Sequence, residues 1–169
     1  MSSTRRALLM DGQALQHQLL AETAERSARY RDRSGRRPRL AAVLVGDDPS
    51  SLTYVSMKRR RSKKVGIDPQ LVELSPTAST HDVVVAVRGL SNDPGVDGIL
   101  VQHPVPSQVD ERAVFAAIAP AKDVDGVTMT SFAAMAFGLG GFVSCTPGGL
   151  GAARENPPKR NRTCVRSCP

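Results

Sequence analysis

The sequence predicts an α/β protein: a three-layer open sheet of parallel strands flanked by helices, followed by an irregular C-terminal tail. Two observations predict this fold. Apolar runs of strand length alternate along the chain with stretches of helical length, and a strand–helix–strand order implies parallel strands with right-handed crossovers. The first and third strand-like runs are apolar throughout, as is typical of strands that are covered on both faces.

The first half of the chain contains two predicted helices and two predicted strands. Leucines recur at three-to-four spacing over residues 7–30, which predicts a helix that ends before "GRRP". "LAAVLVG" over 40–46 predicts a buried strand. "DDPSS" then offers capping side chains to a helix over about 51–65, which ends at Gly66. "QLVEL" over 70–74 alternates like a second strand.

The second half continues the alternation. "STHDVVVAVRGLSND" over 79–93 predicts a helix despite its valines, because Ser79 or Thr80 can cap it and strands seldom reach that length. "VDGILVQ" over 96–102 predicts a third buried strand, and "DERAVFAAIAP" over 110–120 predicts a short helix. No internal repeat is present.

Charge separates the body of the chain from its tail. The 169 residues carry a formal net charge of +7, and residues 151–169 hold +4 of it through five basic residues and one glutamate. This tail is rich in proline, arginine and cysteine and has no apolar period. We therefore expect one folded domain over 1–149 and a divergent, disordered tail over 150–169.

Composition favours a cytoplasmic protein that has no metal and does not contact a membrane. No run approaches the roughly 20 apolar residues that cross a bilayer, and the N-terminal apolar stretch before Asp11 is too short for a signal peptide. The cysteines are odd in number, which argues against a disulfide framework. Cys164 and Cys168 lack the second pair or the histidine that would complete a zinc site.

The stretch "YVSMKRRRSKK" over 54–64 has two interpretations. Tyr54 and Lys58 are four residues apart and share one helix face, where a ring can stack on a planar ligand and an amine can transfer protons. On the local pattern alone, a solvated basic face is favoured. A nucleic-acid surface is a further alternative, although aromatic residues make up only 4% of the chain and single-strand binders use them for stacking.

Further polar residues lie where a parallel sheet binds its ligands. Gln102 ends the third predicted strand, and its amide can bind a lysine or a substrate, or simply terminate the strand. In "AKDVDGV", Asp123 and Asp125 precede or flank a turn at Gly126, and a carboxylate there can bind the paired N–H donors of a heterocycle. His103 is a lone histidine for which a bystander role is favoured.

Several of these segments together resemble one family. "LAAVLVGDDPSSLTYVSMKRRRSKKVGI", "VDGILVQHPVP", "KDVDGVTMTSFAAMAFG" and "SCTPGG" resemble, in order and spacing, the bifunctional methylenetetrahydrofolate dehydrogenase/methenyltetrahydrofolate cyclohydrolase family over roughly residues 7–150. The resemblance implies that Lys58 is catalytic and that Gln102 is its partner. It also implies that Tyr54 stacks on the folate and that Asp125 holds the pterin ring.

The resemblance implies a function in one-carbon metabolism. In the family, 5,10-methylenetetrahydrofolate is oxidised with NADP, the methenyl product is hydrolysed to 10-formyltetrahydrofolate, and the enzyme is a homodimer. We therefore expect a folate substrate rather than a nucleic acid as the partner of this chain. A basic nucleic-acid-binding module, using "KRRRSKK" and the tail, and a non-catalytic fragment remain the alternatives.

The resemblance ends near Gly149, where the family continues into an NADP-binding Rossmann domain. The sequence reads "LGAARENPPKRNRTCVRSCP" instead, and we expect a chain truncated before that domain by a shifted reading frame. "FGLGGF" over 137–142 does not match the dinucleotide fingerprint and predicts a flexible turn. Because hydride transfer needs a bound nicotinamide, we expect the dehydrogenase step to be impaired and the hydrolytic step to remain open.

Overall fold

The structure is a computed structural model that describes residues 11–142. The tail predicted over 150–169, the three cysteines and the first residues of the helix predicted over 7–30 lie outside this range. The described elements are, in order, α1 (Gly12–Ser34), β1 (Arg39–Val45), α2 (Pro49–Lys64), β2 (Asp68–Leu74), α3 (Thr80–Asn92), β3 (Gly98–Val101), α4 (Glu111–Ala116), the 3₁₀ turn η1 (Pro120–Lys122) and α5 (Met129–Ala136).

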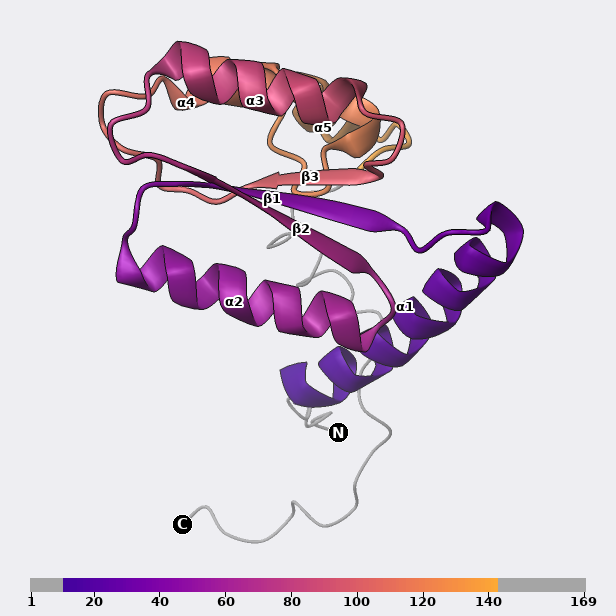
Figure 1. The fold of residues 1–169 in the computed structure, drawn as a ribbon. Coiled ribbons are helices and arrows are strands. Elements are labelled where there is room, and N and C mark those ends of the chain that lie inside the picture. Colours follow the sequence, from indigo (N-terminus) through magenta and orange to yellow (C-terminus); the bar gives the residue numbers. More distant parts are fainter. Residues whose placement is uncertain (1–10, 143–169) are drawn as a thin grey trace, which may run out of the picture.

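The three strands form one parallel sheet in the order β2–β1–β3. Figure 1 shows α2 and α1 on one side of this sheet and α3, α4 and α5 on the other. This arrangement confirms the predicted three-layer α/β fold. Because all three strands run the same way, their carboxyl ends meet at one edge, which is where ligands bind in open parallel sheets.

The core lies mainly between the sheet and α3. Val43 of β1 and Ile99 of β3 are fully buried and pack in one cluster with Val83 and Val87 of α3. On the opposite face, Val55 of α2 is 2% exposed. Both faces of β1 are thus covered, which explains why its sequence is a continuous apolar run.

Helix α2 begins where the capping signal was predicted. The Asp48 carboxylate accepts hydrogen bonds from the backbone N–H of Ser51, at 2.8 Å, and from the Ser50 hydroxyl. These hydrogen bonds lower the pKa of the Asp48 carboxyl, and the one from Ser50 has the largest effect. The cap fixes the first turn of the helix that carries Tyr54 and Lys58.

The structure differs from the sequence expectations at helix α5 and at the bounds of strand β3. Helix α5 was not predicted, because "TMTSFAAMAFG" is apolar around most of its circumference and lacks a helical period; the Thr128 side chain caps it by accepting from the Ser131 N–H at 3.1 Å. The predicted turn over 137–142 does follow α5, with Gly138 at φ +67°. Strand β3 (Gly98–Val101) is shorter than the predicted 96–102, although the residues at both of its ends remain paired with β1: the Asp97 N–H donates to the Arg39 carbonyl at 2.9 Å and the Gln102 N–H donates to the Val43 carbonyl at 2.8 Å.

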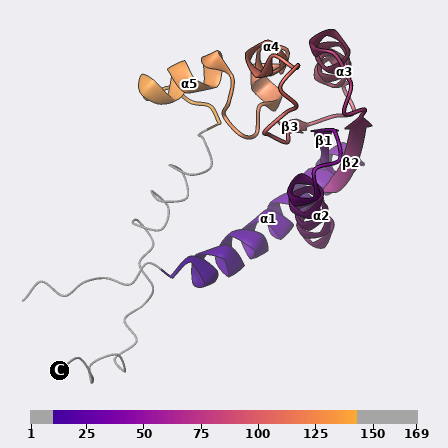
Figure 2. The same cartoon turned by 90° about the vertical axis from the view of Figure 1, so that its left-hand side faces the viewer.

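Asp97 ties helix α1 to the sheet at the edge opposite the carboxyl ends. Its carboxylate accepts hydrogen bonds from the Tyr30 hydroxyl at 2.7 Å, from the Arg36 guanidinium at 2.6 and 2.9 Å, and from the Arg39 N–H at 2.7 Å. Burial opposes ionisation, but the hydrogen bonds outweigh it and lower the pKa of Asp97 to about 2. The N-terminal part of α1, away from these hydrogen bonds of Asp97, extends beyond the sheet, as Figure 2 shows.

Candidate active site

Lys58 and Gln102 meet at the carboxyl edge of the sheet. Lys58 is half-buried on α2, and its Nζ donates a hydrogen bond to Gln102 Oε1 at 3.2 Å. The two residues are 44 positions apart, so the contact exists only because α2 crosses over the sheet next to the end of β3. The structure therefore brings together two of the four predicted site residues.

The Gln102 amide has a fixed orientation. Its backbone N–H donates to the Val43 carbonyl at 2.8 Å, which continues the β1–β3 pairing one residue beyond β3. Its side-chain Nε2 donates to the His103 carbonyl at 2.9 Å. Since the NH₂ group is occupied in this way, the amide oxygen faces Lys58 and acts as an acceptor.

Tyr54 lies one helical turn before Lys58 and exposes 56% of its surface. Val55, the next residue, is buried against the sheet, so the α2 backbone is anchored while the Tyr54 ring is available to solvent. An exposed aromatic ring one turn from an amine can stack on a flat ligand whose reactive atom lies near that amine.

Asp125 lies in the tight turn that precedes α5. The Gly126 N–H donates to the Asp123 carbonyl at 3.3 Å, and Gly126 has a φ of +66°, which favours glycine. Asp123 forms a parallel bridge with Ile99, so this turn is attached to β3, the strand that leads to Gln102. The convergence of Asp125 with Lys58 on one ligand remains a prediction.

The other cations of the motif lie apart from this contact. Arg60, Arg61, Lys63 and Lys64 are exposed, which agrees with a solvated basic face, whereas Arg59 is half-buried like Lys58. His103 is exposed and packs edge-on against Phe115, with ring centroids 6.2 Å apart. No helix within residues 11–142 is long and apolar enough to cross a membrane.

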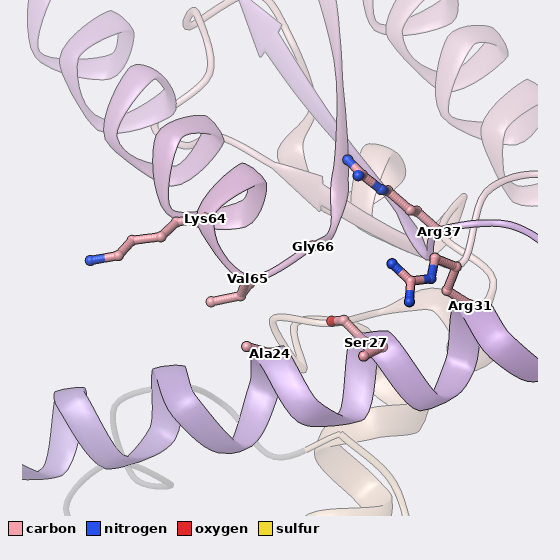
Figure 3. A pocket seen from close by; sticks show the side chains of 8 residues that line it. Ala24, Ser27, Arg31, Arg37, Lys64, Val65 and Gly66 are labelled. Atoms are coloured by element: carbon pink, nitrogen blue, oxygen red, sulfur yellow. The ribbon is translucent and has the colours of Figure 1, made fainter.

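Two hollows in the described chain lie elsewhere. One, of about 170 Å³, separates α1 from the end of α2 and is lined by Ser27, Arg31, Arg37 and Gly66 among others (Figure 3). The other, of about 450 Å³, lies along α1 beside Pro38. Neither of these two hollows is lined by any of the four predicted site residues.

Comparison with known proteins decides the family. Residues 10–125 match the family described as "Tetrahydrofolate dehydrogenase/cyclohydrolase, catalytic domain". The chain belongs to this tetrahydrofolate dehydrogenase/cyclohydrolase family. The match covers more than half of the chain and includes Tyr54, Lys58, Gln102 and Asp125.

Curated relatives in the family are similar over most of this chain. Bifunctional protein FolD 1 of Streptomyces avermitilis is 56% identical over 150 residues, which cover 89% of this chain and 52% of the relative. Bifunctional protein FolD 1 of Salinispora arenicola is 56% identical over 144 residues, or 85% of this chain and 52% of the relative. The chain thus spans about half the length of the curated relatives it matches.

Solved structures of the tetrahydrofolate dehydrogenase/cyclohydrolase family share the fold. The bifunctional FolD dehydrogenase/cyclohydrolase of Campylobacter jejuni has a TM-score of 0.83 at 31% identity, covering 86% of this chain and 52% of the other. The 5,10-methylenetetrahydrofolate dehydrogenase of the silkworm Bombyx mori has a TM-score of 0.84 at 33% identity, covering 89% and 52%. The Trypanosoma brucei enzyme, solved with NADP cofactor and inhibitor, has a TM-score of 0.77 at 28% identity, covering 84% and 49%.

The sequence alone does not assign a functional role to two residues, Asp123 and Gly98. In the sequence Asp123 is one of two acids in a turn, and no local pattern indicates that it is fully buried. Gly98 lies within a predicted strand, and a glycine inside an apolar strand is a signal of close backbone approach that could have indicated its role. A Cβ atom at Gly98 would lie 2.6 Å from Val124 Cγ1.

Proposed function

We propose that this chain forms the folate-binding half of a methylenetetrahydrofolate dehydrogenase/methenyltetrahydrofolate cyclohydrolase, and that its own residues serve the hydrolytic step. The observation that carries the proposal is the hydrogen bond from Lys58 to Gln102 at the carboxyl edge of the sheet. It holds an amine at a ligand-binding edge, one helical turn from an exposed aromatic ring.

Hydrolysis of the methenyl bridge needs a group that accepts and returns a proton. A water oxygen bonds to the bridge carbon while the amine of Lys58 takes a water proton. The bond from this carbon to N5 then breaks, N5 receives the proton back from Lys58, and the hydroxyl loses its own proton to become the formyl carbonyl. The sum is addition of one water and release of one proton, giving 10-formyltetrahydrofolate.

Gln102 would orient the amine during this cycle. Its Oε1 accepts an N–H of Lys58, so that after loss of a proton the nitrogen lone pair would point away from the amide, where a water could bind. A positioned proton acceptor contributes typically 10²- to 10⁴-fold to such a step. The role of Gln102 is thus to set the direction of proton transfer and not to transfer a proton itself.

Tyr54 and Asp125 would hold the substrate. The exposed ring of Tyr54 offers a stacking surface to the planar part of a folate. The carboxylate of Asp125 is an acceptor for the paired N–H donors of a pterin ring. Stacking from α2 and pairing from the turn before α5 would fix the bridge carbon beside Lys58.

The described residues do not fit NADP. Gly138, Gly140 and Gly141 follow the end of α5, whereas a dinucleotide phosphate loop leaves a strand and opens a helix. Residues 11–142 are therefore assigned no part in binding the nicotinamide during hydride transfer. By analogy with the family, we propose that NADP is the oxidant and that the assembly is a homodimer.

The proposal is tested by following the loss of 5,10-methenyltetrahydrofolate spectroscopically. The unsubstituted chain is expected to hydrolyse it faster than buffer, and Lys58→Met is expected to lower the rate by roughly 10²-fold or to the buffer rate. Lys63→Met, an equal charge change at an exposed position of the same helix, is the matched control and should retain the rate. Equal rates for the two variants would contradict the proposal.

A further inference from the structure

The described chain contains a fully buried carboxylate that the proposed reaction does not use. Asp123 is 0% exposed and lies two residues before Asp125 in the same turn. A buried carboxylate costs free energy unless its oxygens are hydrogen-bonded, so its place next to a substrate-binding acid requires an explanation.

The carboxylate of Asp123 binds backbone N–H groups at the far end of its own turn. Oδ1 accepts a hydrogen bond from the Val127 N–H at 3.1 Å, and Oδ2 accepts one from the Thr128 N–H at 2.8 Å. Burial opposes ionisation, but hydrogen bonds from Ser131 and from Thr128 outweigh it and lower the pKa of Asp123. The group is therefore an ionised acceptor that joins both ends of the turn containing Asp125.

The first two residues of the same turn, Asp123 and Val124, also contact β3. Asp123 pairs with Ile99 in a parallel bridge. Val124 packs so closely over Gly98 that a Cβ atom there would lie 2.6 Å from Val124 Cγ1. Because β3 continues directly into Gln102, the turn has a defined position relative to the Lys58–Gln102 contact.

We propose that Asp123 is a positioning residue, which holds the 123–126 turn so that Asp125 faces the folate bound at Lys58. This inference depends on the proposed function. Asp123 itself is buried and touches no substrate; it acts through the backbone N–H groups of Val127 and Thr128. Its effect should therefore appear in substrate affinity and depend on the presence of Asp125.

The test is Asp123→Asn in the full chain, with folic acid as a non-reactive probe of binding. The amide keeps the shape but replaces one acceptor oxygen by an NH₂ group, which then faces a backbone N–H. We expect about tenfold weaker binding of folic acid and a raised KM with a smaller change in kcat. Where Asp123→Asn fails to fold, Ser131→Ala removes one donor to the same carboxylate and should weaken binding less.

A double-mutant cycle separates positioning from general destabilisation. In an Asp125→Asn background, Asp123→Asn should change folic acid affinity little further, because its effect is transmitted through Asp125. Asp97→Asn is the matched control: it also neutralises a hydrogen-bonded carboxylate, at the opposite edge of the sheet, and should lower stability without changing affinity.

The outcomes distinguish this inference from the proposed function. Binding by the unsubstituted chain, together with unchanged affinity in Asp123→Asn, would overturn the inference alone. So would a loss of affinity that adds fully to that of Asp125→Asn, or one that Asp97→Asn reproduces. An unsubstituted chain that neither binds folic acid nor hydrolyses methenyltetrahydrofolate would overturn the proposed function and this inference together.

Discussion

At the scale of single residues, the orientation of one amide decides what Lys58 can do. Gln102 donates through Nε2 to the His103 carbonyl and accepts through Oε1 from Lys58. If the Gln102 amide were flipped by 180°, its NH₂ group would face the N–H donors of Lys58, and no hydrogen bond could form between them. The backbone carbonyl of His103 therefore specifies the arrangement, although the His103 side chain takes no part in it.

Removing the acceptor should slow turnover without unfolding the protein. Gln102→Met keeps a side chain of similar length but cannot accept the Lys58 N–H, so the amine loses its orientation. We expect a fall in kcat of roughly ten- to a hundredfold, because small misplacements of a reacting group are costly. The measurement is the steady-state rate of methenyltetrahydrofolate loss. Gln18→Met, at an exposed position of α1, controls for the substitution and should leave kcat unchanged.

At the scale of elements, the site depends on how the turn before α5 docks on β3. Gly98 opens this strand, and only the absence of a side chain there lets Val124 approach. Valine is stiff about χ1, so it cannot easily move aside. The turn and the strand thus behave as one unit, and a small change in the strand should be felt at Asp125.

Two glycine-to-alanine substitutions should have opposite effects on stability. Gly98→Ala forces Val124 and the turn to shift, which we expect to cost roughly 1–3 kcal/mol and to weaken folic acid binding. Gly89→Ala lies within α3, where a Cβ meets nothing within 4 Å, and should stabilise by about 0.5–1 kcal/mol. Urea unfolding of both variants measures the difference. A Gly98→Ala protein as stable as the unsubstituted chain would show that the close approach is relaxed in solution.

At the scale of the whole molecule, one carboxylate links pH to stability. Asp97 has a folded-state pKa of about 2, below the ordinary value of 3.8, and its partners Tyr30, Arg36 and Arg39 join α1 and β1 to the start of β3. A depressed pKa contributes stability that is fully present above the unfolded-state value and is lost as pH falls through the folded-state value.

Acid should therefore destabilise the fold through Asp97 between about pH 5 and pH 1. The contribution lost is on the order of 2 kcal/mol, from a shift of nearly two pH units on a side chain that is 29% exposed. Denaturant unfolding at several pH values measures this loss. In Asp97→Asn, stability at pH 7 should be lower and the acid-dependent decline smaller; an unchanged decline would assign acid sensitivity to other carboxylates.

Much of the fold could be predicted because its signals are local. The apolar run of β1, the glycine that follows α2 and the capping residues of α3 each leave a mark within a few positions. Helix α5 could not be predicted because its sequence is apolar around most of its circumference and has no helical period. The burial of Asp123 could not be predicted because it depends on the pairing of Asp123 with Ile99 of β3, which no local pattern records. The Lys58–Gln102 contact was anticipated only through resemblance to the tetrahydrofolate dehydrogenase/cyclohydrolase family, because 44 residues separate the pair.

The most direct test of the account is a map of backbone amide signals in the full chain as folic acid is added. The account predicts that the largest changes fall on three separate segments, residues 54–58 of α2, residues 102–103 after β3 and residues 123–126 before α5. Changes confined to one of these segments, or centred on the hollow between α1 and α2, would contradict a single folate site at the carboxyl edge of the sheet.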